Sequence, residues 1–140
     1  MKEKIYEIPD KLVGYYYPET KTIVDHWTDI GASFEEWKST IYDIGIMKSV
    51  QEKGALTWIT DTSNAKGVFK PEIQKFREEV SGMAMAKSGI KLFITVTSAS
   101  AIATLSAKKT LQAYSGNGEM KTASASNLEE AYEIRDRELS

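Results

Sequence analysis

The stretch ALTWITDTSNAKGVFKPEIQKFREEV, residues 55–80, contains the features that decide the fold. Its first seven residues form a continuous, mostly apolar run, which is typical of a strand covered on both faces. Pro71 suits the first turn of a helix, and the spacing that follows puts Ile73, Phe76 and Val80 on one helical face. A buried strand followed by a helix is the repeating unit of a parallel α/β sheet.

A further helix signal precedes this stretch. Ser33 and Glu36 have capping-box spacing, apolar residues recur on one face after them, and Gly54 stops the pattern. The helix that begins near Lys70 has a candidate interruption at Ser81-Gly82. The buried strand is therefore predicted to lie between two helices in the chain.

The alternation continues downstream. Residues 90–98 form a second apolar run, and Ser126 with Glu129 supplies another capping box. The further predicted elements are a helix at 100–114, a short strand at 120–126 and a helix at 127–139. Strands separated by helices imply right-handed crossovers and parallel pairing.

The N-terminal part differs, because its β-rich runs follow one another without a helix. Residues 12–17 and 21–27 are joined at Pro18-Glu19-Thr20, where Pro suits a turn, and residues 4–8 form a candidate edge strand. We therefore predict an α/β sandwich with a mixed, mostly parallel sheet, an N-terminal antiparallel hairpin and about four helices. At 140 residues, the chain is expected to form a single domain, 1–140.

Composition narrows the classes of function. The chain carries 18 Lys plus Arg against 20 Asp plus Glu, with no block of like charge, so neither nucleic acid nor an anionic membrane surface is an expected partner. It contains no cysteine, which excludes disulfides, thiolate catalysis and cysteine-based metal sites and fits a reducing, cytoplasmic location. No window approaches about 18 apolar residues, so we expect no membrane span.

Polar side chains gather where the three predicted parallel strands end. Ligands of open α/β sheets bind beyond the carboxyl ends of the strands, so hydroxyl and N–H groups on one shared edge would form an anion or head-group site. Helix caps and turns use the same residue types, and this is the alternative interpretation. The candidates are Asp61, Thr62 and Ser63, then Thr97, Ser98 and Ser100, then Ser124 and Ser126.

Catalytic chemistry has little support in these residues. Asp61 beside Thr62 and Ser63 could be a carboxylate next to a nucleophile or a metal ligand, but no second carboxylate or base is placed near it. His26 is the only imidazole and lies in the predicted hairpin rather than at the strand ends. We therefore expect no catalytic residue, metal or cofactor, and expect Asp61 to hold its loop by accepting backbone N–H bonds.

Aromatic and methionine residues offer a second kind of site. Tyr and Trp are enriched at interfaces and apolar cavities, and Met is an adaptable pocket filler, whereas core packing is the alternative for both. The residues concerned are Tyr15 to Tyr17, Trp27, Trp37 and Trp58, together with Met83 and Met85.

Residues 58–76, WITDTSNAKGVFKPEIQKF, resemble the signature of the SpoIIAA-like, STAS-type single-domain family. The shared features are a Trp-led strand that ends in Asp, a short loop with Gly, and a helix that begins Pro-Glu. The segments KTIVDHWTDIGASFEEWKSTI, IKLFITVTSASAIATLSAKK and NLEEAYEI are similar to other parts of the family pattern. The resemblance extends from about residue 12 to residue 135.

The resemblance implies helices on a mixed sheet, as in STAS domains and lipid-carrying CRAL-TRIO domains, and binding rather than catalysis. In anti-sigma factor antagonists of this type, a Ser at a helix start, directly after a strand and a loop Asp, is phosphorylated, and the added charge blocks docking to a kinase-like anti-sigma factor. This chain departs from the pattern, because residues 64–69 separate Ser63 from the helix start near Lys70. Ser63, or Thr62, is the candidate phosphoacceptor that the resemblance implies.

Three functions follow from these observations. The leading hypothesis is a non-enzymatic STAS-like binding or regulatory module that acts through a protein partner or its own homodimer. The alternative is a carrier of a lipid or other apolar small molecule, which requires a sizeable enclosed cavity. The third is a hydrolase or transferase that uses the Ser and Thr side chains at the strand ends, and it requires a base near them.

Overall fold

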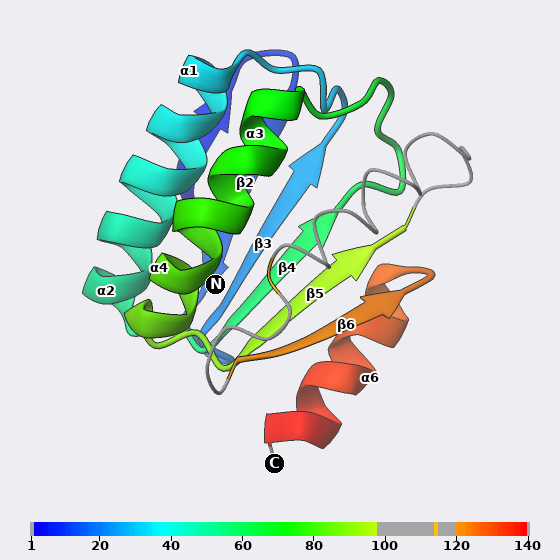
Figure 1. The fold of residues 1–140 in the computed structure, drawn as a ribbon. Helices are drawn as coiled ribbons and strands as arrows, with labels where there is room; N and C mark the ends of the chain where they lie inside the picture. The colour runs from blue at the N-terminus through cyan, green and yellow to red at the C-terminus, as the bar shows by residue number, and fades with distance from the viewer. Residues whose placement is uncertain (1, 98–113, 115–119, 140) are drawn as a thin grey trace.

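The computed structural model describes residues 2–97, 114 and 120–139, which form a six-stranded sheet with helices on both faces (Figure 1). The strands lie across the sheet in chain order: β1 (Glu3–Ile8), β2 (Leu12–Tyr17), β3 (Thr22–Trp27), β4 (Thr57–Asp61), β5 (Leu92–Val96) and β6 (Lys121–Ala125). β1 to β3 pair antiparallel, and β3 to β6 pair parallel. The predicted mixed sheet with an N-terminal antiparallel hairpin is confirmed, and so is the edge strand β1.

Among the described residues, two composite helices cover one face of the sheet, and one helix covers part of the other (Figure 1). The first composite helix joins α1 (Phe34–Trp37), η1 (Lys38–Ser49) and α2 (Val50–Lys53); the second joins α3 (Pro71–Phe76), η2 (Arg77–Ser81) and α4 (Gly82–Ser88). The η segments have π-helical hydrogen bonding. The single helix is α6 (Leu128–Leu139), and the helix predicted at 100–114 lies outside the described residues except for Tyr114.

Two predicted helix signals are confirmed by hydrogen bonds. The Glu36 N–H donates to Ser33 Oγ at 3.1 Å, and the Ser33 N–H donates to Glu36 Oε1 at 2.9 Å, which completes the capping box. Gly54 ends the first composite helix in the left-handed conformation, with φ of 69°. Pro71 occupies the first turn of α3.

Two other helix predictions were wrong. Ser81 and Gly82 do not interrupt the second composite helix, because both keep right-handed helical backbone angles and Ser81 packs in the core within hydrogen-bonding distance of the Tyr114 hydroxyl. The cap of α6 is Asn127, whose Oδ1 accepts the Glu130 N–H at 2.8 Å. The predicted capping pair of Ser126 and Glu129 is therefore replaced by Asn127 and Glu130, one residue further along the chain.

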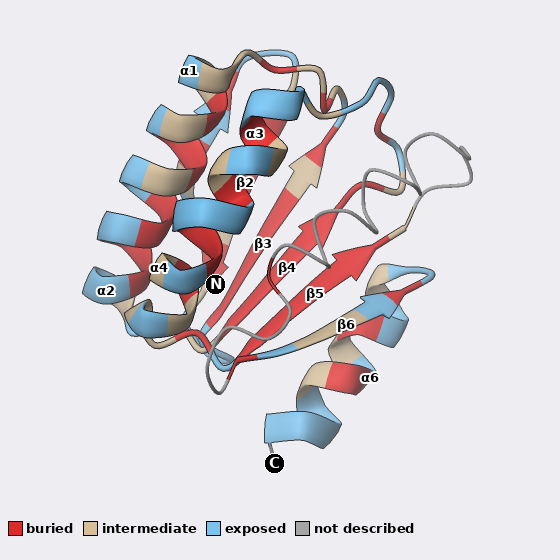
Figure 2. Cartoon of the chain, in the orientation of Figure 1, coloured by how far each residue is buried: buried red, intermediate tan, exposed pale blue. Residues whose placement is uncertain are grey.

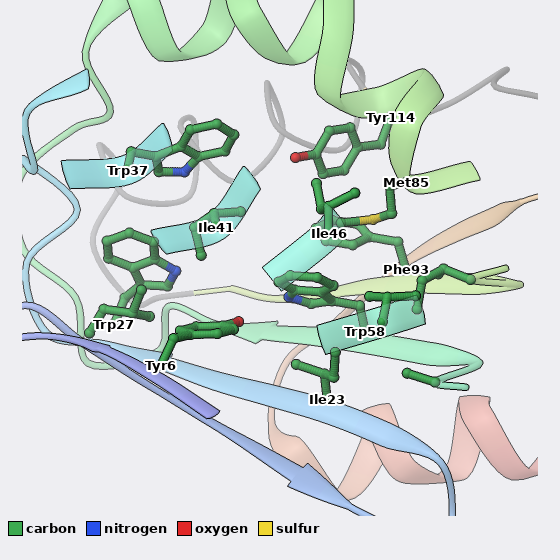
Figure 3. Close-up of a cluster of buried hydrophobic side chains, with 14 of the residues drawn as sticks. Tyr6, Ile23, Trp27, Trp37, Ile41, Ile46, Trp58, Met85, Phe93 and Tyr114 are labelled. Carbon is green, nitrogen blue, oxygen red and sulfur yellow. The ribbon is translucent and has the colours of Figure 1, made fainter. Parts of the chain in front are cut away.

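The sheet separates two hydrophobic cores (Figure 2). The larger core lies under the composite helices and contains all three Trp side chains (Figure 3). The smaller core lies under α6 and is centred on Val24, Ile59 and Ile94. β4 and β5 are buried along their whole lengths, as their continuous apolar runs predicted.

Glycine permits two close approaches in the larger core. A Cβ at Gly14 would lie 2.3 Å from the Tyr6 ring, so Tyr6 can cross its neighbouring strand only because this position has no side chain. A Cβ at Gly45 would lie 2.6 Å from the Trp58 indole. Both rings cover the centre of the sheet, and they stack with centroids 6.1 Å apart.

The substitution Gly14→Ala is expected to lower the free energy of unfolding by about 1–3 kcal/mol, because the new methyl group overpacks the Tyr6 ring. Chemical denaturation would measure the loss. In a Tyr6→Ala background the same substitution should cost far less, because the ring it displaces is absent. Equal costs in the two backgrounds would contradict this account.

Candidate functional site

The carboxyl ends of β3 and β4 bring together two residues that are far apart in the sequence. His26 and Asp61 are register partners in the parallel ladder, and their side chains lie on the α6 side of the sheet. The distance between His26 Nδ1 and Asp61 Oδ2 is 3.0 Å. The prediction that His26 lies away from the strand ends was wrong, because parallel pairing of β3 with β4 places it beside Asp61.

The second carboxylate oxygen of Asp61 holds the following loop. Its Oδ1 accepts the Ser63 N–H at 3.0 Å and the Ser63 hydroxyl at 2.6 Å. The expected role of Asp61, fixing the loop through backbone N–H groups, is confirmed by this geometry. Further along the loop, the Ile30 N–H donates to the Lys66 carbonyl, and the Lys66 N–H donates to the Thr28 carbonyl, so the loop is also tied to the segment after β3.

The hydrogen bond between His26 and Asp61 favours the charged form of both side chains. Burial acts to raise the pKa of the Asp61 carboxyl, but the hydrogen bonds from His26 and Ser63 outweigh it and hold that pKa below the ordinary value. The hydrogen bond to Asp61 raises the pKa of His26 against the opposing effect of partial burial. The imidazole side chain is 33% exposed, so solvent and a partner can reach it.

This arrangement differs from a nucleophilic triad. In a triad the serine hydroxyl is hydrogen bonded to the imidazole, which takes its proton. Here the Ser63 hydroxyl donates to Asp61, as the imidazole does. Thr62 is buried, and its hydroxyl donates to the Val96 carbonyl at 2.7 Å, so it does not supply an accessible nucleophile either.

The other predicted site residues do not all join this group. Thr97 lies at the same edge and its backbone N–H donates to the Ala125 carbonyl; Ser124 is exposed on β6; and the Ser126 hydroxyl contacts Glu130. Ser98 and Ser100 lie outside the described residues. Met83 and Met85 lie on α4, which leads into the opposite end of β5; Met83 is exposed and Met85 is buried. The strand-end residues and the methionines are therefore separate features.

A second polar group, which sequence reasoning missed, lies inside the larger core. Asp25 is completely buried and accepts hydrogen bonds from the Tyr6 hydroxyl at 2.7 Å and the Trp58 indole N–H at 3.2 Å. Thr60, its register partner on β4, donates a hydroxyl hydrogen bond to the other carboxylate oxygen. Burial raises the pKa of Asp25 from 3.8 to about 6, although these three donors act to lower it.

Arg77 faces this carboxylate from the helical layer. Its guanidinium lies 3.9 Å from the centroid of the Phe69 ring and 5.1 Å from that of Trp37, both of which suit cation–π contact. Burial lowers the pKa of Arg77, while Tyr114 and Asp25 act to raise it. Ile73, Arg77 and Ser81 are spaced four residues apart and lie on the same buried face of the helix. This spacing is the sequence signal that could have identified Arg77 as a buried residue.

A small cavity lies between Asp25 and Arg77. Its volume is about 10 Å³, and the aromatic side chains of Figure 3 form much of its wall. This is room for about one water molecule, whereas ligand pockets usually measure about 300–1,000 Å³. The three Trp residues pack in the core around it, as the core-packing alternative expected.

The described residues contain neither a metal-binding cluster nor a membrane-spanning helix. Among them, no group of three or more His, Asp or Glu side chains is arranged to hold a metal ion. Within the same residues, no helix has the length and apolar character needed to cross a bilayer.

Comparisons with known proteins returned no match. No family model, no curated protein and no solved structure is significantly similar to this chain.

The titration of His26 tests the pair directly, because the chain contains a single imidazole. In Asp61→Asn, the pKa of His26 should fall toward its ordinary value of 6.5, because the neutral amide no longer stabilises the imidazolium. NMR of the ring protons would measure it. Asp43→Asn, an exposed carboxyl on η1, is the control and should leave the titration unchanged. An unchanged pKa in Asp61→Asn would refute the pairing.

Asp25 should make stability depend on pH. Its pKa is raised in the folded state, so the folded protein holds this proton more tightly and loses stability as pH rises from about 4 to 6. A shift from 3.8 to about 6 corresponds to about 3 kcal/mol. Urea denaturation across this range should show the loss in the wild type and its absence in Asp25→Asn. Parallel stability curves for the two proteins between about pH 4 and 6 would contradict the assignment.

Proposed function

We propose that the protein is a non-enzymatic, STAS-like regulatory module that binds a protein partner through the loop after β4, under control of Ser63. The observation that carries this proposal is the sharing of one carboxylate, Asp61, between Ser63 and His26. The mixed sheet with helices on both faces agrees with the architecture that the family resemblance implies. A reducing, cytoplasmic location fits the absence of cysteine and belongs to the same proposal.

Modification of Ser63 would change this group by simple electrostatics. A phosphoryl group replaces the hydroxyl proton that Asp61 accepts and adds about 1.5 to 2 negative charges beside a carboxylate that is already ionised. Repulsion would separate Ser63 from Asp61 and release the loop. His26 is the nearby cation that could then bind the phosphate.

Position also favours Ser63 over Thr62 as the modified residue. Ser63 is half-buried at the start of the loop, whereas Thr62 is 1% exposed and is held by Val96. A kinase needs an accessible hydroxyl, so only Ser63 meets this requirement without local unfolding.

The alternative, a carrier of a lipid or other apolar molecule, has weaker support. The cavity beneath the composite helices has room for about one water molecule and is lined by a carboxylate and a guanidinium. Carriage would require this region to open and to accept an apolar ligand beside two buried charged groups, at a cost in free energy.

The regulatory proposal predicts a phosphate on Ser63 in protein isolated from its own cells, and a partner that distinguishes the two states. Binding should persist in Ser63→Ala and weaken at least about tenfold in Ser63→Asp. Ser39→Asp, at an exposed serine on η1, is the matched control and should bind like the wild type. Affinity measured by calorimetry with the purified partner would provide the comparison.

Equal affinity of all these proteins for the partner would contradict control through Ser63. Reproducible substrate turnover that is lost in Asp61→Ala would contradict the non-enzymatic part of the proposal.

A further inference from the structure

The small cavity beneath the composite helices lies between two buried charged groups. Asp25 is completely buried, Arg77 is 3% exposed, and every other residue that lines the cavity is buried as well. Aromatic rings from the helical layer and from the strands close around it (Figure 3). The described residues therefore separate the contents of the cavity from bulk solvent.

The Asp25 carboxylate can accept more hydrogen bonds than its three protein donors supply. A carboxylate has about four acceptor positions, about two on each oxygen. Oδ2 accepts from the Tyr6 hydroxyl and the Trp58 indole N–H, whereas Oδ1 accepts from the Thr60 hydroxyl. One acceptor position on Oδ1 therefore remains, and filling it would stabilise the buried carboxylate.

Arg77 brings hydrogen-bond donors to the cavity from the helical layer. Its guanidinium has five N–H groups, and the Tyr114 hydroxyl is one of its hydrogen-bond partners. Asp25 acts on Arg77 through its charge, and none of the described hydrogen bonds of Asp25 reaches Arg77 directly. The two opposite charges therefore interact across the cavity rather than by contact.

The size and the charges of the cavity select its occupant. Its volume of about 10 Å³ corresponds to about one water molecule. A cation at this position would be repelled by Arg77, and an anion would be repelled by Asp25. An apolar molecule would leave the remaining acceptor position of Asp25 unfilled. The occupant that meets all these conditions is a small neutral molecule that both donates and accepts hydrogen bonds.

We propose that one water molecule occupies this cavity and bridges the buried charges, donating a hydrogen bond to Asp25 Oδ1 and accepting one from the Arg77 guanidinium. Buried waters usually make about three hydrogen bonds, and the hydroxyl groups of Thr60 and Tyr114 also line the cavity. Asp25 and Arg77 are thus an ion pair mediated by water.

The bridge connects the helical layer to the sheet. Asp25 lies on β3 and Arg77 lies on η2, where Phe69 and Trp37 hold its guanidinium by cation–π contacts. A water between the charges lets the guanidinium keep these contacts while it still stabilises the carboxylate. No step of this proposal uses the loop after β4, so it is independent of the regulatory role of Ser63.

A high-resolution crystal structure of the wild-type protein tests the bridge directly. The crystals should be grown at a pH above the Asp25 pKa of about 6, so that the carboxylate is ionised. We expect electron density for one water within about 2.5–3.2 Å of both Asp25 Oδ1 and an Arg77 nitrogen. Density that contacts only one of these groups, a direct hydrogen bond between Asp25 and Arg77, or no density in the cavity would overturn the proposal.

Two methionine methyl groups on α4 allow a matched measurement in solution. Met85 lines the cavity and is 1% exposed, whereas Met83 is 53% exposed. In protein with ¹³C-labelled methionine methyl groups, water should give the Met85 methyl NOE and ROE cross-peaks of opposite sign, because a trapped water tumbles with the protein. The Met83 methyl contacts bulk water and should lack this signature. Absence of the signature at Met85 would overturn the proposal.

A variant separates the water from a nearby hydroxyl proton that exchanges with solvent. Tyr114→Phe removes such a proton from the wall of the cavity, and the Met85 cross-peaks should persist in it. Circular dichroism would check that the variant keeps the fold. Loss of the cross-peaks in folded Tyr114→Phe would identify the hydroxyl as their source and would also overturn the proposal.

Discussion

The structure depends on a single buried carboxylate at the junction between its antiparallel and parallel halves. Asp25 accepts hydrogen bonds from β1 through Tyr6 and from β4 through Trp58 and Thr60, so three strands are tied to one side chain. A buried carboxylate is costly unless its oxygens are satisfied. The requirement for these donors fixes the register of β3 against β4, and Gly14 supplies the space that Tyr6 needs.

The candidate site, His26 and Asp61, is the residue pair that follows Asp25 and Thr60 in the β3–β4 ladder. Successive residues of a strand point to opposite faces, so fixing Asp25 against Thr60 in the larger core places His26 against Asp61 on the α6 side. The two carboxylates then have opposite properties. Burial raises the pKa of Asp25, while the cationic partner and the donors of the loop lower that of Asp61. The strand register that pairs Asp25 with Thr60 in the core therefore also pairs His26 with Asp61 at the accessible edge.

Sequence reasoning predicted the fold better than the site, for a physical reason. The strands and caps depend on local periodicity, which is visible in residues 55–80 and in the Ser33 capping box. The partnership of His26 with Asp61 depends on the pairing of strands 35 residues apart, which no local pattern contains. Asp25 could have been noticed as a lone carboxylate inside an otherwise buried strand, but its three donors come from distant segments.

Asp25 and Asp61 belong to consecutive residue pairs of the β3–β4 ladder, and their surroundings shift their pKa values in opposite directions. Titration of the side-chain carboxyl carbons by ¹³C NMR would read both in one sample. We expect Asp25 to titrate near 6 and Asp61 to titrate below 3.8. If both titrate together near 3.8, Asp25 does not occupy a desolvated core, and the register that creates the candidate site is wrong.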